Sequence, residues 1–154
     1  GNSHAMSRHH VNLNLQPRST LLVFDDRRTL TLPVGPERLA ESVLHHDPPT
    51  PAELERAIDL VEDALAGLHI ASAGSDRLVS ADTLLLALPG LGPQGGSLTR
   101  DAVEFLFQRL ASRALGTPVP AAELPHGREI AAALLILREC MHHLGFGGID
   151  VGPA

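Results

Sequence analysis

The spacing of hydrophobic residues changes along this chain from a two-residue repeat near the start to a helical repeat over most of the remainder. Weak alternation over residues 7–18 is compatible with an edge strand, although the same segment could be a disordered leader. Residues 20–24 and 29–32 are short β-prone runs on either side of the charged segment 25–28. They predict a hairpin with one buried face, which helices must cover.

Helical spacing predicts five helices after the hairpin. The clearest begins after Thr50, because Thr50 and Glu53 form a capping-box pattern around Pro51. Its apolar residues then recur along one helix face up to Leu65. The other four helices are expected to begin at Pro36 and end at 45–47, to span 81–88 with Ser80 as the cap, to span 99–115, and to span 127–144 with Gly145 as the C-cap.

The last predicted helix contains a segment, residues 131–137, that is apolar on every side. Such a segment must be buried all round, either by the sheet and the other helices or by a second copy of the protein across a two-fold axis. We therefore expect a homodimer, with Ala131, Leu135 and Ile136 as interface candidates. Residues 146–151 could add a short strand or form a frayed tail.

Composition limits the classes of partner. The chain has 154 residues, a formal net charge of −6, no Trp or Tyr and four Phe, which argues against a nucleic-acid surface. The longest apolar run, 130–137, is far shorter than the roughly 20 residues of a membrane-spanning helix. Cys140 is the only cysteine, so no intrachain disulfide can form and a cytoplasmic location is the default expectation.

The length fits a single domain, expected over residues 18–150. Residues 1–6 resemble a tag remnant followed by a start methionine. Residues 7–17 form the possible strand or leader, and 151–154 a tail.

Three histidine doublets are the most distinctive local feature: His9 and His10, His45 and His46, and His142 and His143. Histidines in the last turn of a helix can bond to its free carbonyl groups and interact favourably with the helix dipole. Metal binding and proton transfer are the functional alternatives. Glu139 precedes His142 by three residues and His143 by four, so it can pair with either along the helix.

One candidate ligand site combines residues from two of these segments. Cys140 and His143 lie three residues apart and can face one another on a helix. With His45 or His46 they could bind zinc or another transition metal. A nucleophilic Cys140 would need His143 as its base, whereas a single cysteine in an apolar helix is usually a core residue.

The outer face of the helix over 51–65 is strongly acidic. Only Arg56 offsets its five carboxylates, which are Glu53, Glu55, Asp59, Glu62 and Asp63. This excess of negative charge indicates either a cation site or basic partner, or simply a solvated helix face.

The glycine-rich segment 90–97 leads directly to the predicted start of a helix. Free amides at a helix N-terminus favour anions, so Gly95, Gly96, Ser97 and Thr99 are candidates for an anion-binding loop. The spacings of dinucleotide-binding and P-loop motifs are absent, which favours a connector instead.

Together these patterns predict an α+β fold, a mostly helical single domain with an N-terminal β-hairpin packed by four or five helices. No residue is assigned a catalytic role and no cofactor is expected. The favoured function is a non-enzymatic protein interaction or regulatory domain that associates with itself. The alternative is a small-molecule or metal-dependent enzyme, with zinc or another transition metal, whose site lies near the helix end at 140–143.

Overall fold

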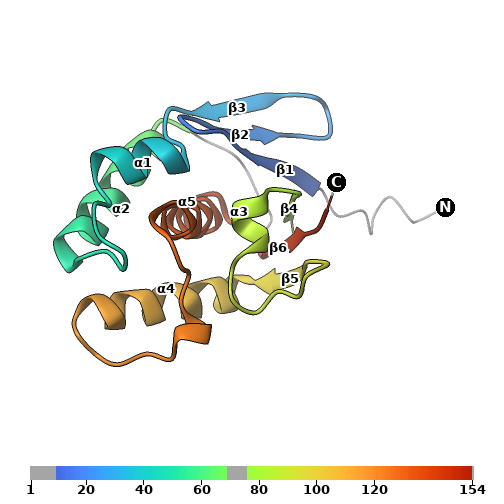
Figure 1. Ribbon diagram of the computed structural model, residues 1–154. Coiled ribbons are helices and arrows are strands. Elements are labelled where there is room, and N and C mark those ends of the chain that lie inside the picture. Colours follow the sequence, from blue (N-terminus) through green and yellow to red (C-terminus); the bar gives the residue numbers. More distant parts are fainter. Residues whose placement is uncertain (1–9, 69–75, 154) are drawn as a thin grey trace.

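The computed structural model describes residues 10–68 and 76–153, and a six-stranded mixed sheet is its central element (Figure 1). The strands lie in the order β3-β2-β1-β4-β6-β5. The central three, β1, β4 and β6, run parallel, and the outer pairings are antiparallel. The strands are β1 (His10–Leu15), β2 (Thr20–Val23), β3 (Thr29–Leu32), β4 (Arg77–Ser80), β5 (Gly96–Thr99) and β6 (Gly148–Val151).

Strand β1 lies inside the sheet, which corrects the expectation of an edge strand or leader over 7–18. Val11 and Leu13 are buried while Asn12 and Asn14 are exposed, as its two-residue repeat predicts. One side of β1 pairs with the neighbouring strand β2 and the other with the distant strand β4. The parallel partner is too far away in sequence for local patterning to reveal it, and β3 and β5 form the edges.

The predicted hairpin is present as β2 and β3. Its charged turn is closed by Asp26, whose carboxylate accepts bonds from the backbone amide of Arg28 at 3.0 Å and from Arg28 Nε at 2.7 Å. The buried hydroxyl of Thr20, the first residue of β2, donates at 2.8 Å to the carbonyl of Val34, which follows the hairpin. That bond holds the start of β2 against the segment that leads into the first helix.

Five α-helices follow the predicted order: α1 (Pro36–Ser42), α2 (Pro51–Leu65), α3 (Thr83–Leu86), α4 (Arg100–Ala114) and α5 (Arg128–Leu144). A short 3-10 helix spans Ala121–Glu123. The capping box of α2 is confirmed, because Thr50 and Glu53 exchange both side-chain bonds. Gly145 ends α5 in the left-handed conformation, as predicted. Helix α3 is capped by Asp82 and not by Ser80.

Helix α5 lies at the centre of the molecule, in contact with α1, α2, α3 and α4 (Figure 1). Residues 131–137 are buried, with exposed fractions of 0–1%. The sheet and helices of one chain therefore cover this segment on all sides. This corrects the choice of Ala131, Leu135 and Ile136 as interface residues, because a second copy cannot reach them; the homodimer itself stays a prediction.

The architecture contradicts the expected fold class. A six-stranded sheet replaces the hairpin-plus-helices arrangement, because four short strands that pair over long sequence separations complete it. Residues 148–151 form an interior strand and not a tail. The tag remnant at 1–6 lies outside the described residues. Among the helices of the described ranges, none is long and apolar enough to cross a membrane.

Candidate functional site

The three parallel strands end at one edge of the sheet, at Leu15 in β1, Ser80 in β4 and Val151 in β6. In open sheets of this kind, ligands bind beyond the carboxyl ends of the strands, where the chain leaves neighbouring strands in different directions. Here β1 turns back into an antiparallel hairpin while β4 continues into α3. A ligand site is therefore expected at this end of the parallel strands, called the carboxyl edge below.

An open groove of about 260 Å³ lies at the carboxyl edge. It is formed where the β1–β2 turn meets the first residues of α1, α3 and α5. Three lining residues are carboxylates and none is basic. The groove is lined by Leu15, Gln16, Pro17, Pro36, Glu37, Asp82, Thr83, Leu84 and Glu129.

Backbone contacts fix the walls of this groove. The Ser80 hydroxyl donates to the Leu13 carbonyl at 2.8 Å and accepts the Asp82 amide at 3.2 Å. The Asp82 carboxylate accepts the Leu84 amide at 2.8 Å. On the opposite wall, Gly35 packs so closely on the turn that a Cβ there would collide with the Gln16 carbonyl oxygen. Hydrogen bonds and close backbone packing thus fix the positions of the segments that line the groove.

A second cluster of ionisable groups lies between α2 and α5. Glu62 of α2 meets Glu139 and His143 of α5, and one ligand atom from each lies within 4.8 Å of the others. His143 Nε2 is 3.6 Å from Glu62 Oε2 and 3.6 Å from Glu139 Oε1. Glu139 is buried, with 1% of its side chain exposed, whereas Glu62 and His143 open to solvent. We call these three residues the Glu–Glu–His cluster.

Arg138 orients the buried carboxylate. Its Nη1 donates to Glu139 Oε2 at 2.7 Å, and its Nε donates to Glu104 Oε1 on α4 at 2.8 Å. The guanidinium also stacks on the Phe107 ring, 3.9 Å from its centre. Burial raises the pKa of Glu139, the charge of Arg138 opposes that effect, and the neighbouring Glu62 raises it further. Among the described residues, Glu139 Oε1 has no hydrogen-bond partner.

The predicted helix-end residues separate into different environments. Cys140 is fully buried, and burial, with the charge of Glu139, raises the pKa of its thiol to about 12. That pKa opposes a thiolate ligand or nucleophile at neutral pH. His142 Nδ1 accepts from Arg100 Nη2 at 3.2 Å, and its ring lies edge-on to the His143 ring, with the ring centroids 5.5 Å apart. Glu139 and His143 are brought together, with Glu62 instead of Cys140 as the third group.

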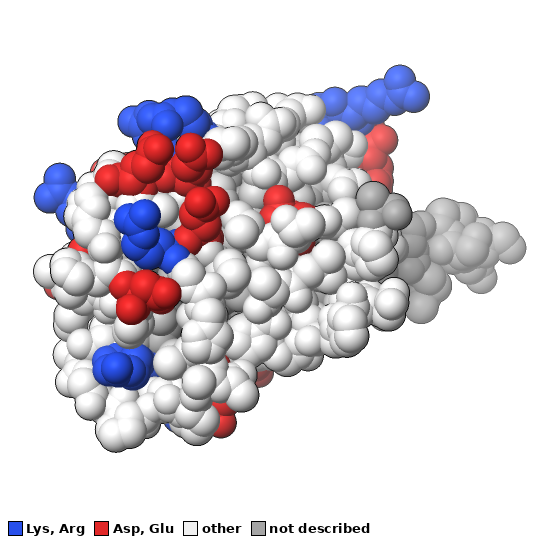
Figure 2. All heavy atoms as spheres, viewed as in Figure 1, with Lys and Arg blue, Asp and Glu red and all other residues white. Residues whose placement is uncertain are grey.

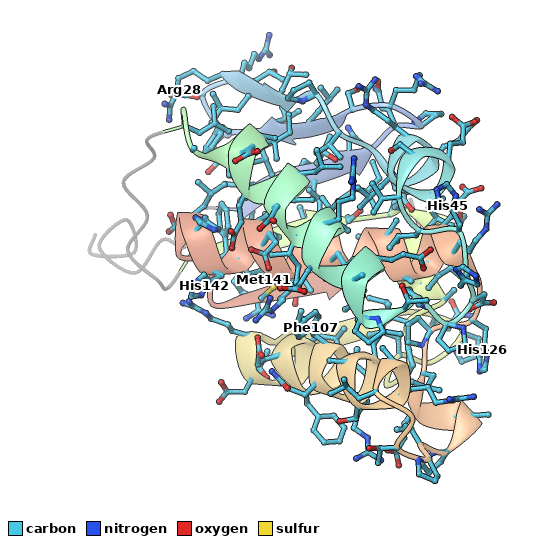
Figure 3. All side chains as sticks on the ribbon, turned by 90° about the vertical axis from the view of Figure 1, so that its left-hand side faces the viewer. Arg28, His45, Phe107, His126, Met141 and His142 are labelled. Atoms are coloured by element: carbon cyan, nitrogen blue, oxygen red, sulfur yellow. The ribbon has the colours of Figure 1, made fainter. Side chains whose placement is uncertain are left out.

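His45 lies near the opposite end of α5 from His142 (Figure 3). Arg128, the first residue of α5, bonds to the carbonyl of Leu44, next to this doublet. Fourteen residues of helix separate Arg128 from His142, a distance of about 21 Å. The structure therefore does not bring the two doublets together as one ligand set.

The doublet at 45–46 instead contacts the start of α2. The His45 amide donates to Glu53 Oε2 at 3.2 Å, and His46 Nδ1 lies 2.8 Å from the same oxygen. Helix α1 has already ended at Ser42, so these histidines are not in its last turn. Of the first doublet, His10 is an exposed residue of β1, and His9 lies outside the described residues.

The glycine-rich segment 90–97 forms a turn closed by a bridge between Gly92 and Gly95, and its last two residues begin the edge strand β5. Gly96, Ser97 and Thr99 belong to β5, which pairs with β6. The Thr99 hydroxyl accepts the Ala102 amide at 3.0 Å and so caps α4. The Ser97 hydroxyl donates to the Asp150 carboxylate at 2.6 Å. A Cβ on Gly95 would collide with the Val151 carbonyl oxygen, so this glycine serves close backbone packing.

Solved structures of known proteins share this architecture. A Ppx/GppA family member from Aquifex aeolicus matches with a TM-score of 0.67 and 18% identity, over 96% of this chain and 53% of that chain. The type II variant of the Aquifex aeolicus Ppx/GppA phosphatase matches with a TM-score of 0.69 and 17% identity, over 99% and 56%. An exopolyphosphatase from Cytophaga hutchinsonii gives a TM-score of 0.65 and 12% identity, over 95% and 53%. The chain has a Ppx/GppA-like fold.

Two of these matched structures are described as a phosphatase and an exopolyphosphatase, which contradicts the hypothesis of a non-enzymatic interaction domain as the favoured function. The chain spans about half the length of the solved chains that it matches. No protein-family model matches the sequence, and no curated protein is similar to it in sequence.

Sequence reasoning missed the groove at the carboxyl edge. Its residues come from four separate segments, which only the pairing of β1 with β4 and the position of α5 bring together. The capping potential of Asp82 was an available signal, since Asp before a short apolar helix is a preferred N-cap. It would have located the start of α3 but not the groove.

Proposed function

We propose that this chain forms one half of a phosphate-handling enzyme and binds a phosphorylated compound together with a divalent cation in the groove at the carboxyl edge. The observation that carries this proposal is the Ppx/GppA-like fold, which covers 94–99% of the chain. Neighbours with this fold are named exopolyphosphatase and Ppx/GppA phosphatase. A groove at the expected edge of the sheet supports it.

The charge of the groove explains why a cation is part of the proposal. Glu37, Asp82 and Glu129 would repel a phosphate group that approached alone. On the face shown in Figure 2, acidic and basic side chains are interspersed over α1 and α2. The described residues form no extended basic patch on this face. Mg²⁺ binds through one or two carboxylates plus substrate phosphates, and so offsets this repulsion.

The matched neighbours are nearly twice as long as this chain, so half of their fold has no counterpart in it. We propose that a further segment or a second copy of the chain supplies the opposite wall of the groove. The predicted homodimer would meet this need. Sedimentation with and without Mg²⁺ and tripolyphosphate tests that possibility, because a shared ligand would increase the dimer fraction.

The test of the groove is a titration followed by two-dimensional NMR of the ¹⁵N-labelled chain. Tripolyphosphate is added in the presence of Mg²⁺ and, separately, of EDTA. We expect Mg²⁺-dependent shifts in the amide signals of residues 15, 16, 18, 19, 35, 37 and 82–84. Asp82→Asn retains an N-cap and should weaken these shifts by removing a charge, as should Glu37→Gln.

Glu55→Gln is the matched control, because Glu55 is exposed on α2 and outside the groove. It should leave the titration unchanged. Shifts that are independent of Mg²⁺, that arise only elsewhere, or that persist in both groove variants would contradict the proposal.

A further inference from the structure

We propose that the Glu–Glu–His cluster binds a divalent transition-metal ion, with Zn²⁺ as the best match. This site lies between α2 and the end of α5. It is distinct from the groove at the carboxyl edge, which includes Glu129 at the start of α5. Glu129 and His143 are fourteen helical residues apart, or about 21 Å.

The geometry of the cluster is close to a coordination shell. A tetrahedral site with bonds of 2.0–2.2 Å places its ligand atoms about 3.3–3.6 Å apart. His143 Nε2 lies 3.6 Å from one oxygen of each glutamate, and the three atoms fall within 4.8 Å. A small movement of the exposed Glu62 side chain would complete the triangle.

A buried and unpartnered atom points independently to a ligand. Glu139 has 1% of its side chain exposed, and within residues 10–68 and 76–153 no hydrogen-bond partner of its Oε1 is present. Arg138 bonds only to the other oxygen, Oε2. Buried polar atoms are normally satisfied, so an orphan oxygen aimed at an imidazole and a second carboxylate is a feature that a metal ion would explain.

The charges of the surrounding groups suit a divalent cation. Glu62, Glu139 and Glu104 contribute three negative charges when ionised, and Arg138 contributes one positive charge. With His143 neutral, as metal binding requires, the formal sum is −2. A divalent ion would neutralise the group, and the partial exposure of Glu62 and His143 provides an entry path.

The ligand types favour Zn²⁺ over Mg²⁺ or Ca²⁺. Imidazole with carboxylates suits zinc, iron, cobalt and nickel, whereas Mg²⁺ and Ca²⁺ prefer oxygen ligands alone. Three protein ligands leave the fourth position for water, as in open zinc sites. Arg138 acts as a positioning residue, because its bond to Oε2 directs Oε1 toward the cluster.

The experiment is a titration of metal-free chain with Co²⁺, followed by visible absorption, and with Zn²⁺, followed by calorimetry. We expect one ion per chain and a Co²⁺ spectrum typical of low coordination number. Glu139→Gln, His143→Gln and Glu62→Gln should each weaken binding by at least about tenfold. The Glu62 side chain is 43% exposed, so its variant tests the site even if replacement of the buried Glu139 impairs folding.

His142→Gln is the matched control, since it removes a neighbouring histidine whose ring bonds to Arg100 outside the cluster. It should bind Zn²⁺ like the unmodified chain. Equal losses in His142→Gln and His143→Gln, unchanged affinity in all three cluster variants, or no binding at millimolar Zn²⁺ would overturn the proposal. Unchanged affinity would assign the ion to other groups, such as the groove carboxylates or the remaining histidines.

Discussion

Arg128 Nη1 lies 3.2 Å from the carbonyl oxygen of Leu44, so the first residue of α5 holds the segment that follows α1. The same nitrogen donates to the Ala40 carbonyl at 3.3 Å. Both acceptors are carbonyls at the end of a short helix, where no further turn of helix can satisfy them. One side chain thus joins residues more than eighty positions apart.

Replacing Arg128 with Met should reduce the free energy of unfolding by about 1–2 kcal/mol, because two charge-assisted hydrogen bonds are lost while the apolar stem is kept. Urea denaturation followed by circular dichroism measures this. Arg128→Lys retains a charged nitrogen that can donate hydrogen bonds and should lose less. Equal stability of Arg128→Met and the unmodified chain would show that the contact contributes nothing.

The contacts of Glu53 predict that part of the protein's stability is lost in acid. Partial burial would raise its pKa, but the amides of Thr50 and His45 and the His46 ring together lower it to about 2. The stabilisation from its charge is therefore complete above the ordinary value near 4.5 and is lost as the pH falls from 4.5 toward 2.

Glu53→Gln should destabilise the protein by about 1 kcal/mol at neutral pH, in the range of helix-capping losses. The difference between the two proteins should shrink as the pH falls from 4.5 toward 2. Thermal unfolding over that range measures it. Glu55→Gln, on the same helix without these contacts, should show no such convergence.

The stability lost on replacing Arg138 should grow as the pH rises. Arg138→Met leaves Glu139 buried beside Glu62 without its positive partner, which should cost about 2–4 kcal/mol at neutral pH. Burial already raises the pKa of Glu139, against the effect of Arg138, and loss of Arg138 raises it further. A raised pKa means that stability is retained at low pH and lost as the pH rises.

The loss in Arg138→Met should therefore be smaller near pH 4.5, the ordinary pKa of a glutamate, than at neutral pH. Denaturation at both pH values tests this. In Arg138→Met combined with Glu139→Gln, the pH dependence should largely disappear. If it persists in the double variant, Glu139 is not its source.

Gly35 predicts a steric effect on the groove. Gly35→Ala places a Cβ against the Gln16 carbonyl and the Ser19 amide, so the β1–β2 turn must move. We expect a loss of about 1–3 kcal/mol, typical of overpacking, with amide shifts in residues 15, 16, 18 and 19. Gly67→Ala is the control, because a Cβ there meets nothing within 4 Å. Similar effects of both substitutions would exclude the steric explanation.

Helix ends could be predicted from the sequence where the residues that cap them are close neighbours in the chain. The capping box at Thr50 and Glu53 and the C-cap at Gly145 both identify helix ends correctly, because the bonds involved lie within a few residues. The order of the strands could not be predicted. Strand β1 pairs with β4 and β4 with β6 across long intervening segments, and a four-residue strand does not specify its partner.

The candidate site was predictable only in part. Glu139 and His143 share a helix face, so their proximity follows from spacing. Glu62 also belonged to the acidic face of α2 that the sequence shows. The meeting of these groups depends on how α2 and α5 pack, and the burial of Cys140 depends on the same packing. Neither can be derived from one helix alone.

The central position of β4 has a consequence for how the protein folds. Arg77 of β4 pairs with His10 on one side and with Gly148 on the other, so the middle of the sheet joins both distant parts of the chain. Contacts between such distant segments form slowly, because long loops must close first. Until β6 docks, β4 and β5 expose unpaired edges that can recruit other chains, so aggregation should compete with refolding at high protein concentration.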